Sequence, residues 1–280
     1  MKNTVETFLN AKQNNEKLSL LTAYDYTMAR ILDEQGIHGL LVGDSLGMVI
    51  QGHENTLQVT MDEMVYHTKA VAKGAKNALV IADMPFMSYQ VCKKEAVYNA
   101  GRLIKEGQAH CVKVEGGQAI AKVVAKMVAA SIPVMGHIGL TPQSVNAFGG
   151  FKVQGASKER GLEIIQDALA LEAAGAFAIV LECIPEKLAK IITEKVKIPT
   201  IGIGAGVHCD GQILVYQDML GMGTSEQHPR FIKTYAQTAK LMGEWVKAYM
   251  SEVEVGSFPS SEHTFKISKD VLSAILEEIN

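Results

Sequence analysis

Seven side chains that can bind ions or move protons stand near the ends of short apolar segments of this chain. They are Asp44, Ser45, Asp83, Lys113, Glu115, His137 and Glu182. Lys113 and Glu115 are two residues apart, so in an extended strand their side chains share one face. A random scatter of polar residues would not follow five separate apolar segments in this way. We therefore expect the seven side chains to face one common site.

Three of these residues, Asp44, Asp83 and Glu115, are carboxylates. Mg²⁺ prefers a few protein carboxylates, with water and substrate oxygens completing its octahedron. Three like charges that converge on one site repel each other, so a bound cation is the more economical explanation. The alternative is that they are unrelated carboxylates or are neutralised by Lys113. Zinc is disfavoured because the chain has no His-Glu-x-x-His motif and no cysteine near a histidine pair.

Such a metal with open coordination positions acts as a Lewis acid. A 2-oxo acid that chelated it would become more acidic at the neighbouring carbon, and Lys113 would add positive charge to the developing oxyanion. Proton removal needs a base on a different side from the metal. Glu182, at the end of the apolar segment AFAIVLE, is our candidate, with a purely structural carboxylate as the alternative. His137 either holds substrate oxygens or is an ordinary buried histidine, and its position alone leaves both open.

The elements that must position these residues are eight short apolar segments that alternate with segments of helical period. The expected strands are 18–23, 39–43, 78–82, 111–115, 133–137, 177–181, 200–204 and a weaker 212–216. The expected helices are 28–35, 61–73, 94–107, 119–130, 158–174 and 185–197. Apolar strands separated by helices indicate a parallel sheet covered by helices. Eight such units favour a closed (β/α)8 barrel, whose active site lies at the carboxyl ends of the strands. An open doubly wound sheet is the alternative, because the last strand is weak.

The remaining segments are two long loops and the two ends of the chain. Residues 46–60 and 141–157 each follow a segment that carries site residues, and we expect them to act as lids. A helix at about residues 3–14 is expected to cap the bottom of the barrel. A helical tail at about residues 228–280 is expected to pack or to make oligomer contacts, so residues 1–280 form a single barrel domain. The glycines of IGIGAG (201–206) do not follow the spacing of a nucleotide loop, and we interpret them as a site of close packing.

Composition excludes several classes of protein. A hydrophobic content of 48% with 20% charged residues is ordinary for a globular protein with a large core. A formal net charge of −3 gives no basic face for a nucleic acid. The apolar segments are too short to cross a membrane, and the first residues do not have the pattern of a signal peptide. The four cysteines are far apart, which favours reduced thiols and a cytoplasmic location.

Seven separated motifs resemble those of the ketopantoate hydroxymethyltransferases. In chain order they are LTAYDY, LVGDSLGMV, VTMDEMVYHTKAV, ADMPFMSYQ, VKVEGG, VMGHIGLTPQSVN and IGIGAG with the following DGQILV. The resemblance runs from about Leu20 to Ala248, which is most of the chain. Two segments, GHENTLQVT and VYQDM, depart from the commoner family pattern, and they concern contacts to the folate and not the metal site.

The resemblance implies a TIM barrel of the phosphoenolpyruvate/pyruvate superfamily, assembled as a homodecamer. It implies the transfer of a hydroxymethyl group from 5,10-methylenetetrahydrofolate to 3-methyl-2-oxobutanoate, with one Mg²⁺ per subunit. By their places in the motifs, the metal carboxylates are Asp44, Asp83 and Glu115. The residues that bind the substrate are Asp44, Ser45, Asp83, Lys113 and His137. The catalytic base is Glu182.

Two other functions are considered beside this one. A C–C lyase of the isocitrate-lyase type would use the same metal and oxo acid but no folate. Such lyases usually carry a reactive cysteine in a lid, and neither long loop contains one. A barrel without activity, serving as a binding protein, would have no reason to keep a charged and mutually repulsive site. Both alternatives are therefore disfavoured.

Overall fold

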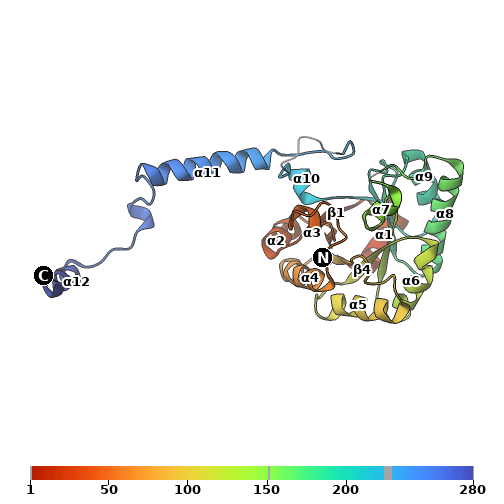
Figure 1. Ribbon diagram of the computed structural model, residues 1–280, viewed down its shortest axis with the longest axis horizontal. Helices are drawn as coiled ribbons and strands as arrows, with labels where there is room; N and C mark the ends of the chain where they lie inside the picture. The colour runs from red at the N-terminus through yellow and green to blue at the C-terminus, as the bar shows by residue number, and fades with distance from the viewer. Residues whose placement is uncertain (1, 151, 224–228, 280) are drawn as a thin grey trace.

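The computed structural model describes residues 2–150, 152–223 and 229–279. Eight parallel strands close into a barrel in chain order, with β8 paired to both β7 and β1 (Figure 1). The strands are β1 (Leu18–Thr22), β2 (Gly39–Val42), β3 (Leu79–Asp83), β4 (Cys111–Glu115), β5 (Val134–Gly139), β6 (Ala178–Glu182), β7 (Thr200–Ile203) and β8 (Gly211–Leu214). This closure confirms the (β/α)8 prediction and excludes the open sheet.

Helices that follow the strands form the outer layer of the barrel. The six predicted ones are α2 (Tyr26–Glu34), α4 (Met61–Gly74), α5 (Lys93–Lys105), α6 (Ala121–Val128), α8 (Lys158–Ala173) and α9 (Glu186–Lys195). Their ends lie close to the predicted ones because caps mark them. The side chain of Thr60 accepts a hydrogen bond from the backbone of Glu63 at the start of α4, and Ser157 does the same for Arg160 at the start of α8. The helix directly after β8 is short, α10 (Tyr216–Leu220).

The strand β5 runs two residues further than the sequence predicts. Gly139, its last residue, pairs with Glu182 at the end of β6. His137 therefore lies inside the strand and not at its end. Its register partner on the other side is Glu115, the last residue of β4. These pairings bring His137, Glu115 and Glu182 to neighbouring positions on three adjacent strands.

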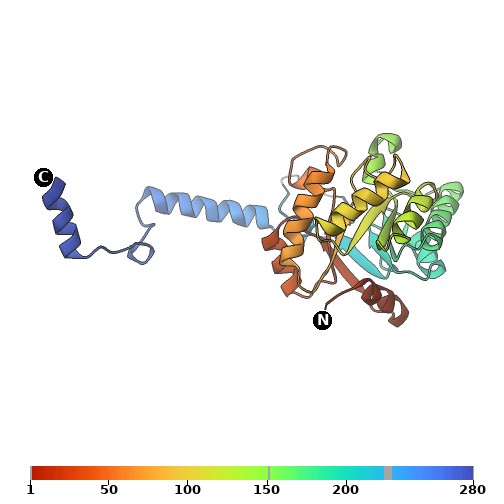
Figure 2. The same ribbon diagram turned by 90° about the horizontal axis from the view of Figure 1, so that it is seen from below.

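The helix α1 (Val5–Asn14), dark red in Figure 2, closes the end of the barrel where the strands begin. Phe8 is fully buried and packs edge-on against Phe177, with ring centroids 6.0 Å apart. Lys12 fixes the helix further, since its Nζ donates to Thr193 O at 2.6 Å and to Asp210 Oδ2 at 2.9 Å. The packing agrees with the capping helix expected at residues 3–14.

The two long loops contain short helices, α3 (Leu46–Val49) in the first, and η2 (Pro142–Ser144) and α7 (Val145–Phe148) in the second. The glycines of IGIGAG pack closely, as expected. Gly204 has a φ of +64°, and a Cβ there would meet Phe231 Cδ1 at 2.9 Å. Residue 151 of the second loop, and residues 228 and 280 at the predicted limits of the tail, lie outside the described residues.

The tail leaves the barrel as two separate helices, α11 (Thr238–Glu254) and α12 (Lys269–Ile279), with the short η3 (Ser261–His263) between them. Figures 1 and 2 show both helices extending away from the barrel in two perpendicular views. No described residue of α11 or α12 is buried, and Trp245 is 62% exposed. Among the described residues, no helix combines the length and apolar character that a membrane span requires.

The carboxylate of Asp33 ties α2 to the start of β3. It accepts hydrogen bonds from Asn77 N at 2.9 Å and from Ala78 N at 2.7 Å. Burial alone would raise the pKa of Asp33, but these backbone hydrogen bonds outweigh it and lower the pKa below its ordinary value of 3.8. The ionised carboxylate is therefore favoured in the folded state, and it stabilises the protein at neutral pH.

We predict that Asp33→Asn lowers the free energy of unfolding at pH 7 by about 2 kcal/mol, because hydrogen bonds to a charged acceptor are lost. This contribution is complete above the unfolded pKa and is lost as the pH falls through the lower folded pKa. Urea unfolding at pH 7 and at decreasing pH should show the difference between variant and parent shrinking in acid. Asp62→Asn, which removes an exposed carboxylate of α4, is the control. A difference that does not change with pH would show that charge is not the cause.

Candidate active site

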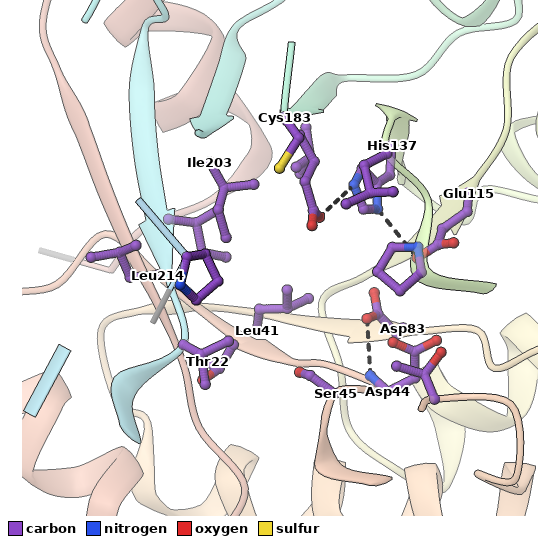
Figure 3. Close-up of a pocket in the computed structure, with 18 of the residues that line it drawn as sticks. Thr22, Leu41, Asp44, Ser45, Asp83, Glu115, His137, Cys183, Ile203 and Leu214 are labelled. Carbon is purple, nitrogen blue, oxygen red and sulfur yellow. Dashed lines mark hydrogen bonds and ion pairs between the residues drawn. The ribbon is translucent and has the colours of Figure 1, made fainter. Parts of the chain in front are cut away.

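One cavity of about 510 Å³ opens at the carboxyl ends of the strands, and all seven residues singled out in the sequence line it. Asp44 and Ser45 follow β2, and Asp83 ends β3. Lys113 and Glu115 come from β4, His137 from β5 and Glu182 from the end of β6. Figure 3 shows His137, Glu115, Asp83 and Asp44 on one side of the cavity, with Ile203 and Leu214 across from them. The expectation of a common site is therefore met in the arrangement of the side chains.

The carboxylates of Asp44 and Asp83 lie next to each other in the polar part of the cavity. The backbone N of Asp44 donates to Asp83 Oδ2 at 3.0 Å, and Lys113 Nζ lies 3.0 Å from Asp83 Oδ1. All three residues are buried. The ammonium of Lys113 is thus already committed to Asp83, which leaves the charge of Asp44 without a cation of its own among these contacts.

The pKa values of this cluster report its excess negative charge. Burial, and then repulsion from Asp83 and Glu115, raise the pKa of Asp44 well above its ordinary value. Burial also raises the pKa of Asp83, although Lys113 opposes this effect. Burial would lower the pKa of Lys113, but the carboxylates outweigh it and raise this pKa, so the ammonium form persists. A further positive charge beside Asp44 would therefore be stabilised.

Glu115 is held differently from the two aspartates. Its Oε2 accepts a hydrogen bond from the backbone N of Gln143 at 2.9 Å, and its Oε1 lies 3.3 Å from His137 Nδ1. Burial would raise the pKa of Glu115, but its hydrogen bond and charge interaction with His137 outweigh this and lower the pKa. Glu115 is therefore an ionised carboxylate under neutral conditions.

His137 stands between the two carboxylates at the base of the cavity. Its Nε2 lies 3.1 Å from Glu182 Oε2, and its Nδ1 lies 3.1 Å from Lys113 Nζ. Burial and Lys113 lower the pKa of His137, but hydrogen bonds to Glu115 and Glu182 outweigh them and raise it to about 9. An imidazolium would carry protons on both nitrogens, whereas a neutral ring that accepts from Lys113 at Nδ1 would carry its proton on Nε2. In both forms Nε2 carries a proton beside the Glu182 carboxylate, and the protonated ring forms an ion pair with it.

Ser45 is oriented by a buried tyrosine. The hydroxyl of Tyr24 lies 2.8 Å from Ser45 Oγ. Burial raises the pKa of Tyr24, so its hydroxyl stays protonated. The ring of Tyr24 in turn packs against Tyr216 of α10, with ring centroids 5.9 Å apart. Ser45 is therefore a fixed hydrogen-bonding group at the wall of the cavity.

Both long loops contribute to the cavity wall. Met48 and Thr56 come from the first, and Pro142, Lys152 and Val153 come from the second. Their position over the site is compatible with the lid role expected from the sequence, which remains a prediction.

Two buried carboxylates of this cavity meet the requirements of a Mg²⁺ site. Among the described residues, no three His, Cys, Asp or Glu side chains are gathered tightly enough to hold an ion by themselves. Mg²⁺ needs only one or two carboxylates when water and substrate oxygens complete its shell. Asp44 and Asp83 fit this requirement, since they are adjacent, buried and short of positive charge. Glu115 Oε1, a buried oxygen whose contact to His137 Nδ1 is long at 3.3 Å, can accept a hydrogen bond from a bound water.

Three residues that sequence reasoning missed complete the site, namely Tyr24, Tyr89 and Gln143. The hydroxyl of Tyr89 accepts from the backbone N of Glu115 at 3.0 Å and lies 2.8 Å from Gln143 Oε1. All three stand inside motifs that carry the family resemblance, and this is the only signal in the sequence that could have pointed to them.

Comparison with solved structures places the fold. The chain resembles phosphonopyruvate hydrolase with a TM-score of 0.61 at 12% identity, covering 99% of this chain and 96% of that one. It also resembles 2,3-dimethylmalate lyase, a member of the PEP mutase/isocitrate lyase superfamily, with a TM-score of 0.60 at 14% identity, covering 100% and 97%. At this identity the likeness concerns the fold alone, and it confirms the TIM barrel.

Comparison with known sequences identifies the family. A model of the ketopantoate hydroxymethyltransferases matches residues 2–261. Two relatives named 3-methyl-2-oxobutanoate hydroxymethyltransferase, from Clostridium beijerinckii and Enterococcus faecalis, are 61% and 62% identical over 275 residues. Each alignment covers 98% of this chain and 100% of the relative. This chain therefore belongs to the ketopantoate hydroxymethyltransferase family of enzymes.

Proposed function

We propose that this protein transfers a hydroxymethyl group from 5,10-methylenetetrahydrofolate to 3-methyl-2-oxobutanoate, giving 2-dehydropantoate (ketopantoate) in pantothenate biosynthesis. The observation that carries this proposal is the arrangement of one cavity. A carboxylate and ammonium cluster stands at one part of its wall, and a separate carboxylate, Glu182, stands at another. Family membership supports the same activity.

The cofactor in this proposal is one Mg²⁺ per subunit, held directly by Asp44 and Asp83 and through a bound water by Glu115. When bound, Mg²⁺ would supply a Lewis acid that polarises the keto group and stabilises an enolate of the oxo acid. A complex of phosphonopyruvate hydrolase with oxalate and Mg²⁺ has been solved, which supports such a role for this type of barrel. The excess negative charge around Asp44 supports the site in this chain.

The substrate oxygens would be held by Ser45, Lys113 and His137, with Asp44 and Asp83 beside them. Ser45 is oriented by Tyr24, and the persistent ammonium of Lys113 would stabilise the oxyanion as it develops. The branched alkyl end of 3-methyl-2-oxobutanoate would lie against the apolar wall that Val180, Ile203 and Leu214 contribute to. The cavity is larger than this substrate needs, which leaves room for part of a second reactant.

The base in this proposal is Glu182, which removes the proton at C3. Its side chain is 15% exposed and lines the cavity, and its Oε2 lies 3.1 Å from His137 Nε2. The resulting enolate would attack an iminium form of the folate methylene, and a C–C bond would form at C3 as the C=N bond becomes single. To give ketopantoate, the C–N bond to the folate would then break and the oxygen of a water molecule would add to the transferred carbon, leaving tetrahydrofolate.

We propose further that the single barrel domain assembles into a homo-oligomer, a decamer by family resemblance, in which the tail contacts another copy. Large apolar residues of α11 recur three or four residues apart and are all exposed, namely Leu241, Met242, Trp245, Tyr249, Met250 and Val253. A contiguous apolar face of this kind in water marks an interaction site. The free cysteines support a reducing, cytoplasmic location, with no nucleic acid as a partner.

For the tail we expect that Trp245→Glu lowers the molar mass of the assembly, because it puts a charge on the apolar face of α11. Light scattering after size exclusion measures this. Lys247→Glu, about 200° further round the helix, is the matched control and should leave the mass unchanged. Trp245 is the only tryptophan of the chain, so its emission in the parent should lie toward the blue, as for a buried indole. An unchanged mass with red-shifted emission in the parent would contradict the contact.

The proposed activity is tested by incubating the purified protein with 3-methyl-2-oxobutanoate in D₂O, with and without Mg²⁺. NMR follows the C3 proton, and methylenetetrahydrofolate is then added. Metal-dependent exchange followed by ketopantoate is the expected result. Exchange without ketopantoate would favour the C–C lyase instead. Absence of exchange under every condition would overturn the proposed reaction while leaving the fold unaffected.

A further inference from the structure

The side chain of Gln143, at the start of the second long loop, has all its polar atoms occupied within the site. The residue lies in η2 and is 6% exposed. Its Nε2 donates to Asp44 Oδ2 at 2.8 Å and to Met84 O at 2.9 Å. Its Oε1 accepts from Tyr89 OH at 2.8 Å and from Gln90 Nε2 at 3.1 Å. An amide alone among the natural side chains donates twice and accepts twice in this way.

The backbone of Gln143 also contacts a second carboxylate, that of Glu115 at the end of β4. The N–H of Gln143 donates to Glu115 Oε2 at 2.9 Å. Asp44 follows β2 and Glu115 ends β4, so one loop residue connects carboxylates from two strands that are not neighbours. Each of the two carboxylates has one oxygen bound to Gln143 and the other free of it. Gln143 therefore determines which oxygen of Asp44 and of Glu115 faces a ligand.

The chemical nature of Gln143 suits this task. A neutral amide orients Asp44 without neutralising it, so the negative charge that attracts a cation is preserved. A lysine in the same place would compete with the cation, and an apolar residue would leave Asp44 Oδ2 buried without a partner, which is costly. Tyr89 holds the amide in the correct orientation, because its hydroxyl contacts both Gln143 Oε1 and the backbone of Glu115.

We infer that Gln143 is a positioning residue that pre-forms the metal site by aiming one oxygen of Asp44 and one of Glu115 into the cavity. This inference rests on the proposed function, because it concerns the Mg²⁺ site of that proposal. The inference links the second long loop to the metal ligands, because Gln143, which orients the carboxylates, lies in the first turn of that loop. Residues that orient metal ligands in this way typically contribute 10- to 100-fold to affinity.

The test is a titration of metal-free protein with Mg²⁺ by calorimetry, without substrate, for the parent and Gln143→Met. Methionine has nearly the same length and lacks the amide, while the backbone N–H to Glu115 is kept. We expect about tenfold weaker Mg²⁺ binding. In turnover, the Mg²⁺ concentration for half-maximal rate should rise by the same factor, with a smaller change in kcat at saturating Mg²⁺. Gln118→Met, at an exposed glutamine whose side-chain amide donates to Asp167 Oδ1, is the matched control.

A second variant guards against a folding defect. Tyr89→Phe removes one partner of Gln143 and leaves its contact to Asp44, so binding should weaken by about threefold, as for one hydrogen bond. Thermal unfolding of each metal-free variant checks that it is folded. If the parent binds Mg²⁺ and both variants bind it within twofold of the parent, the inference is overturned while the proposed metal site stands. If the parent itself does not bind Mg²⁺, the proposed metal site and this inference are both wrong.

Discussion

Replacing Glu182 by Gln should abolish exchange of the C3 proton of 3-methyl-2-oxobutanoate, with a loss of about 10³-fold or more in rate. A neutral amide cannot take up the proton. Its oxygen can stay in contact with His137 Nε2, which lies 3.1 Å from the native carboxylate. The shape of the cavity is therefore kept while the base is removed. The measurement is the NMR exchange experiment in D₂O with Mg²⁺ present.

Binding separates this prediction from a general disruption of the site. The oxo acid should bind the Glu182→Gln variant with a dissociation constant within about threefold of the parent, because Ser45 and Lys113 are unchanged. Glu186→Gln, at an exposed carboxylate at the start of α9, is the control and should exchange at the parental rate. Exchange by the Glu182→Gln variant at more than a tenth of the parental rate would mean that another group is the base.

The second large effect is expected for Asp44→Asn. This variant should bind Mg²⁺ about 100-fold more weakly, and its turnover should be lost as a result. The variant keeps the size of the side chain but loses the charge that attracts the cation. Unlike Asp83, whose Oδ1 lies 3.0 Å from Lys113 Nζ, Asp44 can be neutralised without removing the ion-pair partner of a buried lysine. Calorimetric titration with Mg²⁺ measures the first effect, and ketopantoate formation measures the second.

The same variant should make the metal-free protein more stable. Burial and repulsion raise the pKa of Asp44, so its ionised form is disfavoured in the folded state and lowers stability at neutral pH. Removing that charge should raise the midpoint of thermal unfolding in the presence of a chelator. Ser45→Ala, which keeps the carboxylates, should not do so. A destabilised Asp44→Asn variant that still binds Mg²⁺ like the parent would contradict both parts of the prediction.

The alternation of strands and helices was predictable because each element is decided by nearby residues. Continuous apolar segments favour strands that are buried on both faces. Capping residues such as Thr60 mark where a helix begins. The strand that the sequence predicts least clearly is β8. It contains the exposed Gln212, and its pairing with β1 depends on the far end of the chain. Closure of the ring, and not local propensity, makes this segment a strand.

The charged residues of the site were predictable because strands deliver them to one face. The residues that orient them were not, since Gln143 and Tyr89 reach Asp44 and Glu115 only through the paths of two loops. The direction of the tail was not predictable either. The apolar face of α11 was visible as a helical period, but nothing in a single chain specifies the surface that receives it.

Helix α1, with its buried Phe8, covers the end of the barrel where the strands begin, and this bears on the order in which reactants bind. Apolar side chains such as Leu20, Ile81 and Met135 fill the interior between this helix and the cavity, so reactants approach from the carboxyl ends of the strands. The charged residues Asp44, Asp83 and Lys113 lie in the inner part of the cavity, and the two long loops contribute to its outer wall. In the proposed reaction, the small oxo acid would therefore bind before a bulkier partner that covers the opening, and its product would leave after that partner. The packed floor of the cavity would thus impose an ordered sequence on two reactants of unequal size.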